Sequence, residues 1–134
     1  MSREHINPDT LFPSVPHGFS QVIATRGGKT IYISGQTAWD AEKSLVGGNS
    51  LVEQATQAFQ NVRHAVEAAG GSLADVVALR LYVVNYRPAD ANSLGAILKE
   101  FFPGGNPPTS TWIGVSSLAV ADFLIEIEAV AVVE

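Results

Sequence analysis

The chain has 134 residues, of which 46% are hydrophobic and 16% are charged. This length suits a single domain, residues 1–134, and the hydrophobic content excludes intrinsic disorder. Eight Lys and Arg against thirteen Asp and Glu leave a net charge of -5. No overall positive field attracts nucleic acid or an anionic membrane, so we expect neither as a partner. Because charges are few, much of the surface is apolar, which favours association with copies of the same chain.

Cysteine is absent, which excludes disulfides, thiolate nucleophiles and Cys-ligated metals. The three histidines, His5, His17 and His64, are widely spaced, so we expect no metal site and no metal cofactor. The N-terminus has no apolar run typical of a signal peptide. The longest apolar stretch, 118–133, is interrupted by three acidic residues and cannot span a bilayer. These features predict a soluble, cytoplasmic protein.

The first thirty-odd residues predict an irregular start followed by two strands. Three prolines and a glycine within residues 1–18 predict an irregular lead-in. Residues 19–24 alternate weakly, and residues 30–34 are rich in β-branched and aromatic side chains. The turn Arg26-Gly27-Gly28-Lys29 lies between them, so we expect a β-hairpin.

The periodicity then changes to that of a helix. Ser50 is a suitable N-cap with Glu53 three residues later, a capping-box pattern, and Gly70-Gly71 ends the run. The apolar positions follow i, i+3, i+4, i+7 spacing and predict a long amphipathic helix; they are Val52, Ala55, Ala58, Phe59, Val62, Ala65, Val66 and Ala69. Ser72 or Asp75 opens a short turn.

The remaining elements complete a β-β-α-β-α-β-β order. They are a strand at 76–84, a helix at 88–102, a Pro- and Gly-rich connection at 103–108, and strands at 109–115 and 124–133. This order predicts an α+β fold, a two-layer sandwich with both helices on one face of a mostly antiparallel sheet. Residues 129–133 are apolar on both sides of the last strand, so we expect the second face to be buried by other subunits.

Several segments together resemble the Rid family, the reactive intermediate (enamine/imine) deaminases, also called YjgF-type proteins. The resemblance runs from about residue 16 to the C-terminus. The segments that carry it are Phe19-Ser20-Gln21, Ile33-Ser34-Gly35-Gln36, Ala55 to Asn61, Ala68-Ala69-Gly70-Gly71-Ser72-Leu73-Ala74-Asp75-Val76-Val77 and Ile125-Glu126-Ile127-Glu128-Ala129.

The resemblance implies a chorismate-mutase-like (YjgF-type) fold and a homotrimer with a ligand cleft between each pair of subunits. Active members of the family hydrolyse 2-aminoacrylate-like enamines, or their imine tautomers, to a 2-keto acid and ammonia without metal or organic cofactor. Some members have been described as ribonucleases or translation inhibitors. The net charge and the lack of a basic, aromatic-rich stripe argue against an RNA substrate here.

Three departures from the family pattern fall at what the resemblance implies is one cleft. Deaminase members carry a carboxylate-binding arginine before the fifth strand, but the matching position here is Ser110 in one alignment or Thr109 in another. Phe19 stands where the family has a tyrosine, and Arg87 stands near a frequent asparagine. Arg87 either replaces the lost carboxylate contact or is a solvated turn residue.

For each of the other candidate residues the sequence leaves two roles open, one in the ligand cleft and one purely structural. Glu126 matches the family glutamate that positions water, and is the candidate catalytic residue; otherwise it is a salt-bridged strand residue. Ser34 and Gly35 match the backbone that approaches the ligand, although Gly35 also suits a strand end. Trp112 forms a cleft wall or a core side chain. His17 edges the cleft or lies on a surface loop.

The sequence therefore predicts a Rid-like hydrolase that converts a small enamine or imine to a keto compound and ammonia. Without the arginine, 2-aminoacrylate should be a poor substrate, since a charge-assisted contact contributes roughly 1.5–3 kcal/mol. A less charged and larger ligand is favoured. The alternative is a non-catalytic small-molecule-binding trimer, either a metabolite sensor or a partner-binding module.

Overall fold

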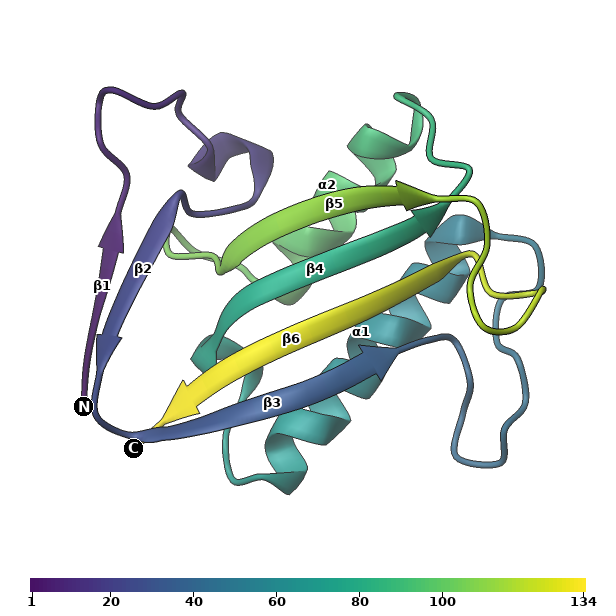
Figure 1. Ribbon diagram of the computed structural model, residues 1–134, viewed down its shortest axis with the longest axis horizontal. Coiled ribbons are helices and arrows are strands. Elements are labelled where there is room, and N and C mark those ends of the chain that lie inside the picture. Colours follow the sequence, from purple (N-terminus) through teal and green to yellow (C-terminus); the bar gives the residue numbers. More distant parts are fainter.

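Both helices pack against one face of a four-stranded sheet in the computed structural model, which describes residues 1–134 (Figure 1). The strand order is β3-β6-β4-β5; β4 and β5 are parallel and the other neighbours are antiparallel. The elements of this layer pair are β3 (Lys29–Gln36), α1 (Leu51–Ala68), β4 (Val76–Val84), α2 (Asp90–Phe101), β5 (Thr109–Val115) and β6 (Ile125–Val133). The predicted α+β sandwich and its element order are confirmed.

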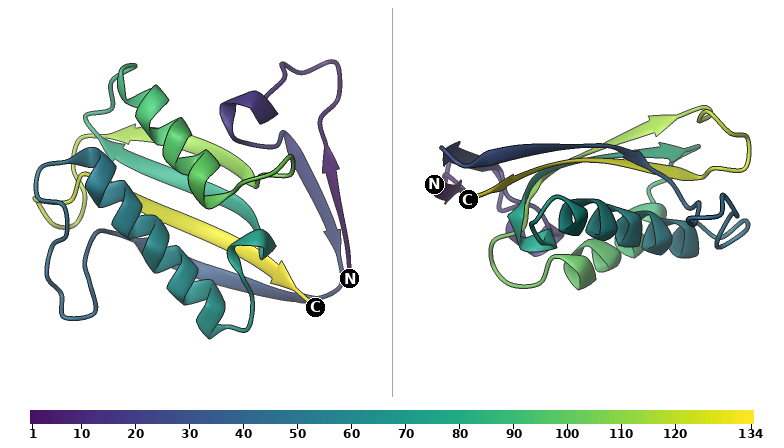
Figure 2. Two further views of the ribbon diagram at one scale, coloured as in Figure 1. Left: turned by 180° about the vertical axis from the view of Figure 1, so that it is seen from behind. Right: turned by 90° about the horizontal axis from the view of Figure 1, so that it is seen from below.

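The sheet has one covered face and one open face, as the edge-on view in Figure 2 shows. Along β6, Ile125, Ile127 and Ala129 are buried under the helices, whereas Glu126 and Glu128 between them are half-buried on the other side. This alternation is the two-residue period of a strand. Within the single chain, neither helix covers the open face.

Local hydrogen bonds mark where each helix begins. Ser50 Oγ accepts a hydrogen bond from the Glu53 backbone N–H at 3.2 Å, the N-cap contact that the sequence predicts for α1. α2 begins at Asp90 rather than at Pro88, because residues 88 and 89 form a turn. Asp90 Oδ2 accepts from the Arg87 N–H across this turn at 3.0 Å.

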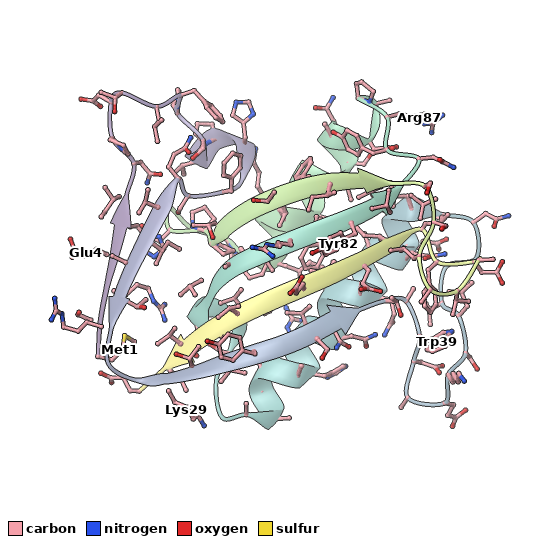
Figure 3. The ribbon with its side chains drawn as sticks, viewed as in Figure 1. Met1, Glu4, Lys29, Trp39, Tyr82 and Arg87 are labelled. Atoms are coloured by element: carbon pink, nitrogen blue, oxygen red, sulfur yellow. The ribbon has the colours of Figure 1, made fainter.

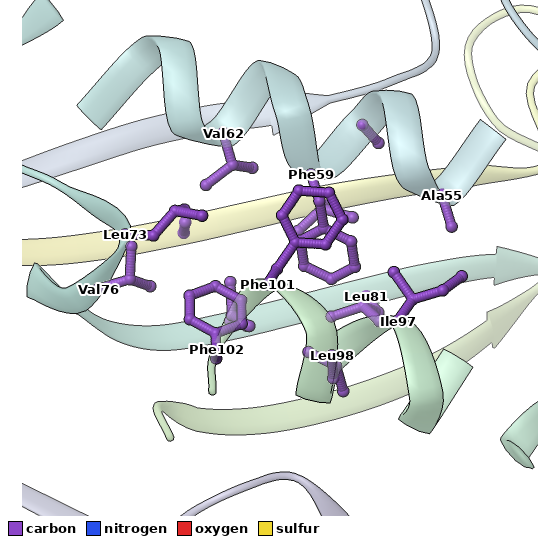
Figure 4. Packing of buried hydrophobic residues seen from close by; sticks show 14 of the residues in the cluster. Ala55, Phe59, Val62, Leu73, Val76, Leu81, Ile97, Leu98, Phe101 and Phe102 are labelled. Carbon is purple, nitrogen blue, oxygen red and sulfur yellow. The ribbon is translucent and has the colours of Figure 1, made fainter. Parts of the chain in front are cut away.

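Aromatic rings join the two helices over the sheet (Figure 4). Phe59 of α1 is fully buried, and its ring stacks on that of Phe101 with centroids 5.3 Å apart. The ring of Phe102 meets Phe59 edge-on at 6.0 Å. Leu81 of β4 and Ile127 of β6 are also fully buried in this cluster. The core thus lies between helices and sheet and fixes how each strand presents its opposite face.

The buried side chain of Gln54 in α1 holds two loops against the helix through hydrogen bonds. Gln54 is fully buried, and its Nε2 donates to Gly48 O at 2.7 Å and Asp122 O at 2.9 Å. Its Oε1 accepts from the Leu124 N–H at 2.9 Å. All of its hydrogen-bonding groups are therefore engaged with backbone, as burial requires. This clamp holds the entry to β6, which carries Glu126.

The N-terminal region differs from two sequence predictions. Within the predicted irregular lead-in, Ser2–Ile6 forms a strand, β1. β2 (Val22–Arg26) pairs antiparallel with β1 and not with β3, so the predicted hairpin of residues 19–24 and 30–34 is wrong. Ser20, just before β2, donates its N–H to Pro108 O at 3.0 Å and bridges to Thr109. This contact draws β2 towards β5 and away from β3.

Residues 1–26 form an N-terminal arm that lies against the rest of the chain (Figure 1). Arg3 attaches β1 to it, because its guanidinium donates to Ala74 O at 2.9 Å and to Val132 O at 2.8 Å. His5 Nδ1 lies 3.2 Å from the hydroxyl of Ser20, which is almost fully buried and in turn donates to Pro107 O. The arm is therefore held by specific polar contacts.

We expect the stability of the folded chain to fall on acidification because of His5. Burial, and secondarily the nearby charge of Arg3, lower the pKa of His5 below its ordinary value of 6.5. The unfolded chain then binds a proton more readily than the folded one, so this stability is complete above pH 6.5 and is lost as the pH falls through the lowered pKa. Thermal unfolding between about pH 7.5 and about pH 5 measures it.

The variant His5→Gln should flatten that pH dependence. The matched control is His64→Gln, since His64 is exposed on α1 and should leave the pH profile of the melting temperature unchanged. An unaltered profile in His5→Gln would contradict the assignment.

Candidate functional site

A pocket with aromatic walls lies between the N-terminal arm, the start of α2 and β5. Its volume is about 330 Å³, and we call it the aromatic pocket; it is lined by Phe12, His17, Phe19, Ala91, Asn92, Ser110 and Trp112. Three of these, Phe19, Ser110 and Trp112, are among the residues that the sequence predicts for ligand binding. The structure thus brings part of the predicted site together within one chain.

The rings of this pocket are arranged edge to face. Phe12 meets His17 with centroids 6.0 Å apart and meets Phe19 at 5.9 Å, an arrangement that favourable aromatic pairs adopt. Trp112 Nε1 donates to Ser110 Oγ at 2.9 Å. Because Ser110 accepts this bond, its own hydroxyl hydrogen is left to donate to a ligand.

A second group, which we call the carboxylate site, consists of Gly35 and Glu126, with the exposed Ser34 next to Gly35 in β3. The side chain of Glu126 lies directly against Gly35, because a Cβ atom built at Gly35 would be 2.6 Å from Glu126 Cδ. The register of β3 against β6 shifts between Ile33 and Gln36, at this same place. A side chain at residue 35 would force the carboxylate to move from this position.

Glu126 is the available carboxylate on β6, and Glu128 is not. Tyr82 Oη donates to Glu128 Oε1 at 2.8 Å, and this bond, with partial burial, raises the pKa of the Tyr82 phenol. The Glu126 carboxylate makes no hydrogen bond or ion pair in the chain, whereas the sequence left open that it was a salt-bridged strand residue. It is therefore free to bind water or a ligand.

The aromatic pocket and the carboxylate site lie on opposite faces of the sheet. Tyr82 of β4 (Figure 3) lies opposite Glu126 on one neighbouring strand and opposite Ile113 on the other. These three side chains therefore share the open face of the sheet. Trp112 comes directly before Ile113 in β5, so its side chain points to the covered face, and it pairs with the buried Leu81. One chain cannot bring Glu126 and Trp112 to the same ligand.

Two predicted residues lie outside both groups. Arg87 is in the turn before α2, beyond the end of β4 (Figure 3), with 77% of its side chain exposed and its guanidinium 3.9 Å from Asp90 Oδ1. It does not line the aromatic pocket. Thr109 donates its hydroxyl to Val77 O at 3.0 Å, which orients it towards β4. Ser110 rather than Thr109 therefore faces the aromatic pocket.

Sequence reasoning missed three residues of the aromatic pocket, Phe12, Ala91 and Asn92. Phe12 lies between Leu11 and Pro13 in the predicted irregular lead-in, where no periodicity marks a side chain as functional. Asn92 is on the exposed side of α2. His17 was considered for the cleft edge and does line the pocket, although it is also exposed.

The fold and these two groups define a class: a two-layer α+β protein whose candidate ligand-binding residues lie on both faces of one sheet. No three His, Asp or Glu side chains are grouped as metal ligands, and neither helix meets the length and apolarity of a membrane span. A family model described as Endoribonuclease L-PSP matches residues 12–133. The chain belongs to this family, the YjgF or Rid family that its sequence resembles.

Individual relatives agree with this membership. A 2-iminobutanoate/2-iminopropanoate deaminase of Dermatophagoides farinae is 31% identical over 134 residues, the whole of both chains. The crystal structure of the Rid-family protein YyfB from Yersinia pestis, whose function is described as unknown, is 44% identical, with a TM-score of 0.95 over 99% of this chain and 100% of that one. RidA from an Antarctic Psychrobacter is 31% identical, with a TM-score of 0.70 over 85% and 87% of the two chains.

Proposed function

We propose that this protein is a cytoplasmic imine or enamine hydrolase that works as a homotrimer, with each active cleft formed between two subunits. The observation that carries the proposal is the division of the candidate residues between opposite faces of the sheet. A neighbouring copy that packs on the open face would place its aromatic pocket against Glu126. The similarity to the mite deaminase over the full chain supports the reaction class.

The assembly would also bury the open face of the sheet. Tyr32, on this face, is 81% exposed in the single chain, and Ile113 is 36% exposed. Exposed apolar side chains on the sheet face that carries Glu126 are typical of surfaces that associate. Burial by a neighbour would exclude bulk water from the carboxylate and strengthen its interactions with the ligand.

Hydrolysis of an imine requires a water molecule as nucleophile and a group that accepts and returns a proton. In the proposed cleft, Glu126 orients a water molecule and accepts its proton as the water oxygen attacks the C=N carbon. Glu126 passes this proton to the imine nitrogen, which gives a neutral carbinolamine. The C–N bond then breaks as the hydroxyl proton moves through Glu126 to the nitrogen, which leaves as ammonia, and the carbon keeps the oxygen as a carbonyl. Ser110 supplies a neutral hydroxyl that can hold the ligand. No metal or organic cofactor is required for these steps.

The experiment that tests this proposal measures imine decay and assembly together. Imines are generated in situ by an amino-acid oxidase from a panel of amino acids, and ammonia release is followed with and without the protein. We expect acceleration for at least one imine and a sedimentation mass three times the 14.2-kDa chain. A single-chain mass at working concentration, or no acceleration with any imine, would refute it.

A specific observation favours the second candidate, a trimer that binds a small molecule without turning it over. By the resemblance, Ser110 or Thr109 stands where the family's deaminases carry a carboxylate-binding arginine, and no Lys or Arg lines the aromatic pocket. A ligand that raises the melting temperature and is recovered unchanged, together with no imine hydrolysis, would identify this function.

A further inference from the structure

We propose that the aromatic pocket binds an aromatic ring, so that the preferred substrate is an aryl-substituted imine without a carboxylate. This inference rests on the proposed hydrolase function and specifies its substrate class. It starts from the residues that line the pocket, among which there is no Lys, Arg, Asp or Glu. A carboxylate bound there would lose water without gaining a guanidinium or ammonium partner, which is costly; the imidazole of His17 is the one titratable group of the lining.

The side chains that line the aromatic pocket are suited to an aromatic ring rather than to a carboxylate. Phe12, Phe19 and Trp112 present three aromatic surfaces to one space. Phe12 is 58% exposed in the chain although it already meets His17 and Phe19 edge-on. A ligand ring that covered Phe12 would remove this exposed apolar surface from water and extend the same edge-to-face pattern.

The size of the pocket agrees with a ring that bears a short chain. A closed apolar cavity of about 150 Å³ is enough to hold benzene. The aromatic pocket has about 330 Å³, roughly twice that volume. The remaining space holds one or two further carbon atoms and the C=N group.

The polar groups of the pocket are few: the Ser110 hydroxyl, the Asn92 amide and the His17 imidazole. The Ser110 hydroxyl has its hydrogen free, because its oxygen accepts from Trp112 Nε1. Asn92, in the first turn of α2, adds an amide that can donate or accept. These two groups can orient one imine nitrogen or one carbonyl oxygen, but they provide no ion pair.

The proposed substrate class defines the overall reaction. An arylalkyl imine such as phenylacetaldimine takes up one water; a C–O bond forms, the C–N bond breaks, and phenylacetaldehyde and ammonia are released. The substrate is the product of a two-electron oxidation of a primary arylalkyl amine, so an amine oxidase is the class of enzyme that would supply it.

The kinetic test compares two imines made in situ. Phenylacetaldimine is generated from 2-phenylethylamine by an amine oxidase, and 2-iminobutanoate from 2-aminobutanoate by an amino-acid oxidase. We expect kcat/KM to be at least about tenfold higher for phenylacetaldimine, and Ser110→Arg, which adds a carboxylate partner, to reverse the preference. A preference of the wild type for 2-iminobutanoate would overturn this inference and leave the hydrolase function standing.

A binding measurement decides the inference even if neither imine is hydrolysed, the result that would refute the hydrolase function. In a Trp39→Phe background, Trp112 is the single tryptophan and reports on the pocket. Phenylacetamide should quench its fluorescence and 2-oxobutanoate should not. Phe12→Ala should weaken phenylacetamide binding about tenfold, whereas the control Val52→Ala, an exposed apolar residue of α1, should not alter it. Equal binding of both probes would refute the aromatic site.

Discussion

Glu126→Gln is expected to lower kcat for imine hydrolysis by about 100-fold or more while the fold is retained. Loss of a general base costs about 10²–10⁴ in rate, and glutamine keeps the size of the side chain but accepts no proton. The carboxylate has no hydrogen-bond or ion-pair partner in the chain, so its removal leaves no group unsatisfied. Ammonia release at saturating imine, with circular dichroism as the check on folding, measures the effect.

Glu128→Gln is the matched control, because Glu128 lies on the same strand and face but is engaged by Tyr82. Its kcat should stay near that of the wild type, since glutamine can still accept the Tyr82 hydrogen bond. Gly35→Ala should resemble Glu126→Gln, because the added methyl group would overlap the Glu126 side chain and displace it. Equal losses in Glu126→Gln and Glu128→Gln would show that the assignment of the base is wrong.

Mixing two inactive variants would reveal whether the cleft is shared. Glu126→Gln leaves the aromatic pocket intact, and Trp112→Ala leaves the carboxylate site intact. If each cleft takes one group from each neighbour, refolding an equal mixture restores about a quarter of the clefts to wild type. Activity that remains as low in the mixture as in the separate variants would argue against a cleft between subunits.

Phe59→Ala should lower the free energy of unfolding by about 3–5 kcal/mol. Phe59 is fully buried, and it joins α1 to Phe101 and Phe102 at the end of α2. Its truncation removes apolar contacts and leaves a cavity that two helices and a sheet cannot readily close. Urea unfolding at a fixed protein concentration measures the change, because association would make the stability depend on concentration.

Phe12→Ala is the comparison for this experiment. Phe12 is also an aromatic residue but is 58% exposed, so its truncation should cost less than about 1 kcal/mol. A similar loss for both variants would mean that the ring cluster between the helices is not the centre of the stabilising core.

Much of the fold could be predicted because it is encoded locally. The spacing of Ala55, Phe59, Val62 and Val66 places one apolar face on α1, and these four residues are all buried. Ser50 caps that helix through the predicted contact. The strands at 76–84 and 109–115 coincide with β4 and β5, since runs of β-branched and apolar residues favour extended backbone over short distances.

The candidate site could be predicted only in part, because its geometry depends on how segments distant in the sequence pair with one another. Resemblance to a family indicates which residues belong together, and Phe19, Ser110 and Trp112 do line one pocket. It does not say which face of the sheet each occupies in one chain. That depends on the register of β4 against β5 and β6, which places Glu126 on the side away from the pocket.

The amino-acid sequence alone determined the helices, most of the strands and the absence of cysteine chemistry, because each depends on composition or on neighbours a few positions apart. The tertiary structure decided the rest. Arg3 reaches Val132 and Ser20 reaches Pro108, so β2 joins β1 rather than β3, and the segment between β1 and β2 brings Phe12 and Phe19 to the pocket beside β5. Such pairings depend on the free energy of contacts between distant segments, for which the local pattern of residues holds no signal.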